Sequence, residues 1–96
     1  MDASASEAPM AEVDAMALRL MEIMEREIDG VTVPRDDAGA DSIARLNLDS
    51  LALVGFLVAV EDEFRVEWDP SADVDTLRSF DAMARYVLAK GGGTGA

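Results

Sequence analysis

The first regular pattern in the chain is a stripe of apolar residues at intervals of three and four. The stripe consists of Val13, Ala17, Leu20, Met24 and Ile28. This spacing places its members on one face of a helix, which we predict over residues 10–29. Gly30 follows where a left-handed cap is common, and Pro34 stops any continuation. The polar residues of the opposite face are interpreted as a solvated surface: Glu12, Arg19, Glu22 and Arg26.

The periodicity disappears between Val31 and Leu48. This stretch has no sustained period and contains Pro34, Gly39 and several aspartates. It is therefore predicted to be a long loop, with one helical turn around residues 42–46. Loops of this length without structure of their own are uncommon and often functional. Three apolar residues are expected to pin the loop to the core: Ile43, Leu46 and Leu48.

A second helix is predicted from Ser50 to Phe64. The apolar run over residues 51–60 is also compatible with a buried strand, because short apolar runs are ambiguous. Two features favour the helix. Asp49 and Ser50 supply N-terminal capping chemistry, and four apolar residues form a helical stripe expected to face the core: Leu53, Leu57, Val60 and Phe64.

The remainder of the chain predicts two further helices. The sequence turns through Trp68 and Pro70, and residues 71–76 are compatible with a short third helix. Ser79 is predicted to cap a last helix whose buried positions are Phe80, Met83 and Val87. Residues 1–9 and 91–96 are small, polar or glycine-rich, and both are expected to be disordered ends. We therefore predict one all-α domain over residues 10–90, a small bundle with three main helices, a short third helix and a long first loop.

Helix 50–64 also carries a second apolar stripe at Leu51, Val54 and Val58, and Asp62 continues the same face. A small bundle could bury both stripes in its core. Alternatively, the second stripe is exposed beside Ser50 and contacts partner proteins. Glu61, Asp62 and Glu63 oppose the dipole at the end of this helix, by a few tenths of a kcal/mol or more each. Residues that oppose local stability favour a binding role, with solubility as the competing explanation.

Composition excludes several classes of function. Twenty acidic residues against eight basic ones leave a net charge of -12, which repels phosphate backbones and anionic bilayers. No nucleic acid or membrane partner is expected. No apolar run approaches the roughly 20 residues that span a bilayer, and the first residues lack the pattern of a secretory signal. A cytoplasmic, monomeric protein is expected.

The sequence offers no set of catalytic residues. It contains no histidine and no cysteine, so the usual base for an activated serine and the protein's own thiol chemistry are both missing. The single lysine, Lys90, adjoins the glycine-rich tail. Asp36, Asp37 and Asp41 lack the alternating spacing and central glycine of an EF-hand, and no metal site is predicted. An enzyme is therefore not expected.

Ser50 is the candidate site. A serine that begins a helix is, in most proteins, simply a cap. Here it follows a long loop that presents it to solvent, and it begins a helix whose dipole and free N–H groups favour an attached phosphate. Asp41, Ser42 and Ile43 form a near copy of the motif, but no long apolar helix follows them. Ser42 is therefore the weaker candidate.

Residues 46–51, Leu-Asn-Leu-Asp-Ser-Leu, followed by Val54, Val60 and the acidic end with Phe64, resemble the acyl carrier protein signature. The resemblance extends over roughly residues 10–90. It implies a four-helix bundle and a Ser50 that carries 4'-phosphopantetheine, transferred from coenzyme A by a separate phosphopantetheinyl transferase. Acyl groups would then be held as thioesters on the thiol of that arm. The implied partners also include acyl-loading, condensing and acyl-transferring enzymes.

In carriers of this kind the start, the outer stripe and the acidic end of the second helix contact partner enzymes. The resemblance therefore implies partner-binding roles for Asp49, Leu51, Val54, Val58, Glu61 and Asp62.

Three positions depart from the family pattern. Asn47 stands where glycine is usual, although asparagine tolerates a left-handed backbone better than most residues. Ala52 and Gly55 stand where many fatty-acid carriers have acids, and Gly55 could permit close approach of a partner or of the arm. These departures favour a stand-alone carrier of polyketide or other specialised-metabolite biosynthesis. The alternatives are fatty-acid synthesis, an aminoacyl or peptidyl carrier and, outside the family, an unmodified acidic helical interaction module.

Overall fold

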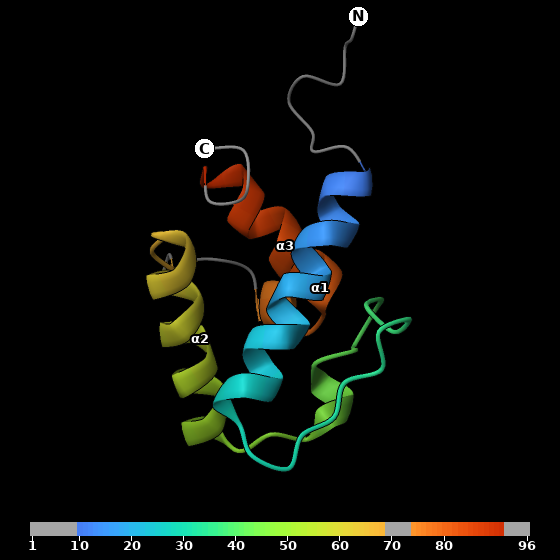
Figure 1. The fold of residues 1–96 in the computed structure, drawn as a ribbon, viewed down its shortest axis with the longest axis vertical. Helices are drawn as coiled ribbons and strands as arrows, with labels where there is room; N and C mark the ends of the chain where they lie inside the picture. Colours follow the sequence, from blue (N-terminus) through green and yellow to red (C-terminus); the bar gives the residue numbers. More distant parts are fainter. Residues whose placement is uncertain (1–9, 69–73, 92–96) are drawn as a thin grey trace, which may run out of the picture.

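The computed structural model describes residues 10–68 and 74–91, and in this part of the chain all regular structure is helical (Figure 1). The segments predicted to be disordered, residues 1–9 and most of 91–96, lie outside the described residues, as does Pro70. Five helical elements follow one another within these two ranges: α1 (Met10–Glu27), the 3₁₀ helix η2 (Ala44–Leu46), α2 (Ser50–Phe64), the 3₁₀ helix η3 (Val74–Leu77) and α3 (Phe80–Ala89). The all-α prediction is confirmed.

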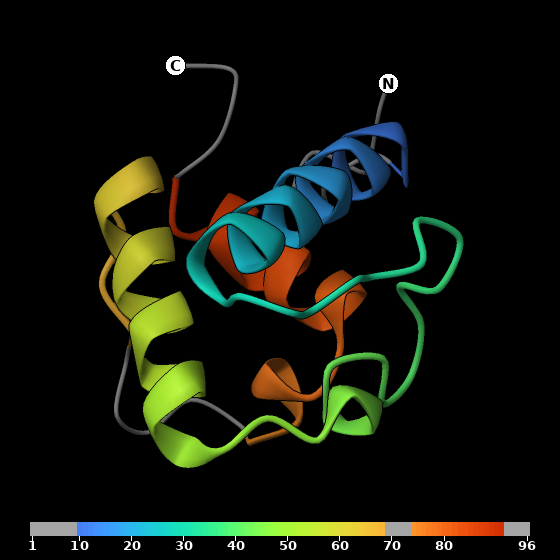
Figure 2. The ribbon, with the colours of Figure 1, turned by 60° about the horizontal axis from the view of Figure 1, so that its bottom comes forward.

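Helix α1 is the central element of the bundle. It packs against α3 along one side and α2 along another, and the long loop leaves its C-terminal end and runs back beside its middle turns (Figures 1 and 2). The predicted stripe is buried, with Ile28 half-buried, but the buried face is wider than one stripe because α1 has two helical neighbours. The additional buried residues are Met16, Met21 and Ile23.

The predicted end of the first helix is two residues too far along the chain. Regular helix stops at Glu27, and the Ile28 N–H still donates to the Met24 carbonyl oxygen at 2.9 Å. Gly30 has a φ of 84°, the left-handed conformation expected for it. A glycine adopts this conformation without the strain that a Cβ atom would bring, so Gly30 turns the chain away from the helix as predicted, although the regular helix has already ended at Glu27.

Helix α2 begins and ends at the predicted residues, but its buried side is different. Val60 and Phe64 are buried as expected, whereas Leu53 and Leu57 are only half-buried. Phe56, absent from the predicted stripe, is completely buried, and its ring meets Phe80 of α3 edge-on with 6.5 Å between centroids. The core side of α2 is therefore centred on Phe56 and Val60, which are both completely buried.

The end of α2 is fixed by the backbone and by an aromatic pair. Arg65 adopts a left-handed conformation, with a φ of 58°. The Trp68 indole N–H then donates to the Leu57 carbonyl oxygen at 3.0 Å, and its ring stacks on Tyr86 of α3 at 5.0 Å between centroids. These contacts connect the end of α2 directly to α3.

The first half of the segment predicted to be a short third helix, residues 71–76, lies outside the described residues. From Val74 to Leu77 the chain forms the 3₁₀ helix η3. The last helix agrees with its prediction: the Ser79 hydroxyl accepts a hydrogen bond from the Ala82 N–H at 3.0 Å, and the three predicted core positions are buried, namely Phe80, Met83 and Val87.

The long loop is held by its own contacts on the rest of the fold. Ile43 is buried, Leu46 and Leu48 are half-buried as predicted, and η2 forms the expected helical turn. The loop also pairs with the segment before α3, since the Ile43 and Ala44 N–H groups both donate to the Arg78 carbonyl oxygen, at 2.8 and 3.1 Å. The loop therefore enters α2 from a fixed position.

Candidate functional site

Ser50 is the first residue of α2, and its side chain is exposed. The capping role belongs to Asp49, whose carboxylate accepts a hydrogen bond from the Ala52 N–H at 2.7 Å. The Asp49 backbone is extended, and its carbonyl oxygen accepts from the Leu53 N–H at 3.0 Å. Since the N-cap of α2 is Asp49, the interpretation of Ser50 as merely a cap is wrong.

The turn before Ser50 depends on Asn47. Its φ of 59° and ψ of 44° place it in the left-handed region, and its N–H closes η2 by donating to the Ala44 carbonyl oxygen at 3.1 Å. Asparagine visits this region more readily than other residues with a side chain. The expectation that Asn47 keeps the turn usually made by glycine is therefore confirmed.

Ser42, the competing serine, is built into the fold. It is only 3% exposed, and its hydroxyl oxygen accepts a hydrogen bond from the Phe80 N–H at 3.0 Å. Ser42 thus satisfies the first N–H of α3, beside the cap that Ser79 provides. A buried hydroxyl with this role is not presented to a modifying enzyme.

The second apolar stripe of α2 lies on the surface. Leu51 is 82% exposed, and Val54 and Val58 are each more than half exposed. Asp62 is exposed further along the same side. The alternative in which the bundle buries both stripes is wrong. We call the surface formed by Leu51, Val54, Val58 and Asp62 the outer face of α2; it begins directly beside Ser50.

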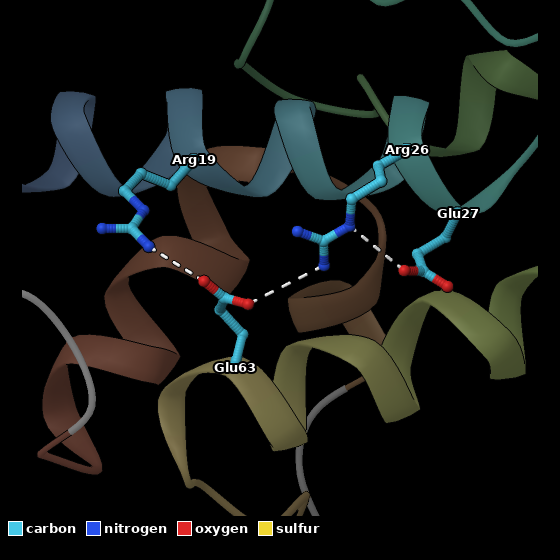
Figure 3. A network of polar contacts seen from close by, with 4 residues as sticks. All are labelled: Arg19, Arg26, Glu27 and Glu63. Atoms are coloured by element: carbon cyan, nitrogen blue, oxygen red, sulfur yellow. Dashed lines mark hydrogen bonds and ion pairs between the residues drawn. The ribbon is translucent and has the colours of Figure 1, made fainter.

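The three acidic side chains at the end of α2 point in different directions. The Glu61 carboxylate accepts a hydrogen bond from the Trp68 backbone N–H at 2.9 Å. Glu63 points toward α1, where it pairs with Arg19 at 3.1 Å and Arg26 at 3.7 Å (Figure 3). Asp62 remains on the outer face. Of the two acids expected to bind partners, the structure therefore directs Asp62 outward and engages Glu61 within the chain.

The arginines on the polar side of α1 are only partly a solvated surface, which corrects the sequence interpretation. Arg19 and Arg26 reach across to α2 through Glu63, and Arg19 also lies over the Phe64 ring, 5.2 Å from its centroid. These contacts place positive charge near the last turns of α2, where the helix dipole is negative. Sequence reasoning missed the contacts because the pairs are far apart in the chain.

Glu25 fixes the start of the long loop. Its carboxylate accepts hydrogen bonds from both terminal nitrogens of Arg35, at 2.8 and 2.9 Å, and from the Val33 N–H at 2.7 Å. The Arg35 guanidinium, helped by that N–H, lowers the pKa of Glu25 from 4.5 to about 2. The same pair raises the pKa of Arg35. No sequence signal indicated this anchor.

The described ranges, residues 10–68 and 74–91, contain neither a metal site nor a membrane-spanning helix. Within them, no cluster of acidic side chains is arranged to hold a metal ion. No helix in the same ranges has the length and apolar character needed to cross a bilayer.

The arrangement at Ser50 fits a covalently attached phosphopantetheine. The hydroxyl is exposed, the first N–H groups of α2 form a region that favours an attached phosphate, and no acidic side chain stands in the first turn of the helix to repel it. Leu51 provides exposed apolar surface at the same place.

Comparison with known proteins identifies the family. Residues 19–87 match the family described as phosphopantetheine attachment site. Comparisons with curated proteins and with solved structures gave no match. Because the family match covers well over half of the chain, the protein belongs to this family: it is a carrier domain of the acyl carrier protein type, which holds 4'-phosphopantetheine covalently and is not itself an enzyme.

Proposed function

We propose that Ser50 is the residue that receives the arm, and that the protein works as a stand-alone acyl carrier in polyketide or other specialised-metabolite biosynthesis. The observation that carries the assignment to Ser50 is the separation of roles at the start of α2. Asp49 caps the helix, so the exposed Ser50 hydroxyl is left for the transferase.

The residues around Ser50 would act by positioning. Asn47 and Asp49 fix the entry into α2, so the hydroxyl is presented from a rigid helix end rather than from the loop. Free N–H groups in the first turn support the negative phosphate of the attached arm. When bound, the arm supplies a thiol that holds an acyl group as a thioester.

The outer face of α2 supports a role in docking. An exposed apolar patch beside an attachment site suits contact with the enzymes that load and use the arm. Carriers of this family interact with a phosphopantetheinyl transferase and with biosynthetic enzymes. We propose that Asp49, Leu51, Val54, Val58 and Asp62 form this contact, with a smaller role for Glu61 because the Trp68 backbone engages it.

The preference for specialised metabolism over fatty-acid synthesis rests on the surface nearest Ser50. Ala52 and Gly55 carry no charge where many fatty-acid carriers have acids, and the three apolar residues of the outer face are exposed. Recognition there would depend on shape more than on charge. We further propose a cytoplasmic monomer, supported by a net charge of -12 that opposes self-association. The family match argues against the alternative of an unmodified interaction module.

The attachment site is tested by intact mass. The protein is incubated with coenzyme A and a transferase of broad specificity, and the wild type is expected to gain the mass of one arm. Ser50→Ala should gain nothing, whereas the matched variant Ser42→Ala should be modified like the wild type. Gain of the arm by Ser50→Ala would overturn the assignment.

The pathway is tested by the intact mass of the protein purified from its native host. A polyketide-type acyl cargo supports the proposal, whereas a saturated fatty acyl chain or an aminoacyl group would place the protein in one of the alternative pathways. The same measurement reports whether the carrier exists as a separate chain.

A further inference from the structure

The chain almost lacks the side chains that attack thioesters. It has no cysteine and no histidine, and among its eight basic residues only Lys90 is a lysine. A cysteine thiol, a histidine imidazole and a lysine amine are the side chains that attack acyl groups most readily. Arginine keeps its proton in proteins and therefore does not act as a nucleophile. The chain thus offers a bound thioester seven inert guanidinium groups and a single amine.

Lys90 lies at the opposite end of the bundle from Ser50. It follows the last residue of α3, and Figures 1 and 2 show the end of α3 far from the start of α2. The Lys90 ammonium lies over the Tyr86 ring, 5.5 Å from its centroid, where the negative face of the ring attracts a cation. The one lysine is therefore bound by a neighbouring ring, away from the candidate attachment site.

The basic residue that precedes Ser50 most closely in the chain is an arginine. Arg45 comes five residues earlier, so the backbone between the two residues spans at most about 17 Å. A phosphopantetheine arm of about 14 bonds extends over roughly the same length, by the advance per bond of an extended chain. The Arg45 side chain is half exposed. A thioester at the end of an arm on Ser50 can therefore reach it.

Packing explains some of the arginines, but not all of them. Arg35 holds the Glu25 carboxylate with both of its terminal nitrogens, at 2.8 and 2.9 Å, a contact that the planar guanidinium allows and a lysine does not reproduce. Arg85 approaches only the Met10 sulfur, at 3.9 Å. The Arg65 side chain has no polar contact within the described residues. Arginine therefore replaces lysine even where the fold does not require a guanidinium.

We propose that this distribution of basic residues protects the acyl cargo, because every basic side chain within reach of the loaded arm is an arginine. The reaction that it prevents is transfer of the acyl group to the carrier itself. In that reaction a neutral lysine amine attacks the thioester carbonyl carbon, a C–N bond forms and the C–S bond breaks. The nitrogen loses a proton to water, and the sulfur leaves as a thiolate. The inference rests on the proposed function, since it requires the arm on Ser50.

A lysine placed within reach of the arm tests the proposal. The full chain is loaded from acetyl-coenzyme A by a transferase of broad specificity and is then held at about pH 9, where more lysine is neutral than at pH 7. Hydroxylamine cleaves a thioester but not an amide, so intact mass after this treatment counts the transferred acetyl groups. Arg45→Lys should retain about tenfold or more acetyl than the wild type, because a tethered thioester meets a nearby amine at high effective concentration.

Two matched variants separate the position of the amine from other effects of the substitution. Arg85→Lys adds an amine beside Met10, at the start of α1 and far from Ser50 (Figure 1), and should retain no more acetyl than the wild type. Arg45→Gln removes the ion pair with Asp37 but adds no amine, and it should also match the wild type. Peptide mapping should place the resistant acetyl group on residue 45, at a rate independent of protein concentration.

The outcomes distinguish this inference from the proposed function. Equal retention of acetyl by Arg45→Lys and Arg85→Lys overturns the protection, because the position of the amine would then not matter. Acetylation of Lys90 in the wild type as fast as that of residue 45 in Arg45→Lys overturns it as well. A wild-type protein that gains no arm at Ser50 contradicts the proposed function itself, and with it the inference. Normal loading of all variants without a difference in transfer contradicts the protection alone.

Discussion

Asp41-Ser42-Ile43 and Asp49-Ser50-Leu51 repeat the same classes of residue eight positions apart, yet they have opposite roles. Ser42 and Ile43 are each 3% exposed, and the Ser42 hydroxyl satisfies the first N–H of α3. Ser50 is exposed, and Leu51 is 82% exposed. Ser42 and Ile43 of the first tripeptide are part of the packed interior, whereas Ser50 and Leu51 of the second are accessible to other molecules. Local sequence similarity therefore does not predict which of the two serines is accessible.

The largest difference in stability is expected between substitutions of the residues that follow the two serines, Ile43 and Leu51. Ile43→Ala should lower the free energy of unfolding by about 2–5 kcal/mol, because it leaves a cavity in the core. Leu51→Ala should change it by no more than about 0.5 kcal/mol, since its side chain is in solvent. Urea unfolding of both variants measures the contrast. Similar losses for the two would mean that the outer face of α2 is buried in solution.

The second largest difference in stability is expected between substitutions of Ser42 and Ser50. Ser42→Ala leaves the Phe80 N–H without its acceptor and should cost about 1–3 kcal/mol. Ser50→Ala removes a hydroxyl from solvent and should stay within about 0.5 kcal/mol. Thermal unfolding of the unmodified proteins checks this, with the wild type alongside. Greater destabilisation by Ser50→Ala would contradict the division of roles between Asp49 and Ser50.

A smaller difference in stability is expected between substitutions of Asp49 and Asp41. Asp49→Ala removes the cap of α2 and should cost about 1 kcal/mol, whereas Asp49→Asn keeps the acceptor and should restore most of it. Asp41 pairs with Arg78 at 2.8 Å, but both side chains are about half exposed. Asp41→Asn should therefore cost about 0–1 kcal/mol, and asparagine tolerates its left-handed φ of 64°. A larger loss for Asp41→Asn than for Asp49→Ala, by urea unfolding, would reverse the comparison.

The smallest effect concerns the anchor of the long loop, which carries the first tripeptide and leads into the second. Because Arg35 lowers the pKa of Glu25 to about 2, the stabilisation from this carboxylate is complete above its ordinary value near 4.5 and is lost as pH falls toward 2. The stability difference between wild type and Glu25→Gln should be constant above about pH 5 and shrink below it. Urea unfolding at several pH values measures this, and a difference that grows on acidification would contradict the pairing.

Helix α2 illustrates why part of the fold escaped prediction. Residues 51–60 contain no charged side chain, so apolar residues surround the helix and its periodicity does not single out one buried side. The limits of the helix were predictable from local capping at Asp49, whereas the burial of Phe56 depends on where α1 and α3 lie. Similarly, the contacts of Glu63 with Arg19 and of Glu25 with Arg35 join residues whose pairing leaves no local pattern.

The sequence by itself determined the helical class, most element limits and the family, because these depend on local spacing, caps and a short motif. The tertiary structure decided which serine is exposed and which side of α2 remains at the surface. It also decided that Asp62, of the three acids at the end of α2, lies on the outer face. These properties depend on neighbours that are distant in the chain, and burial is decided only when the helices have packed.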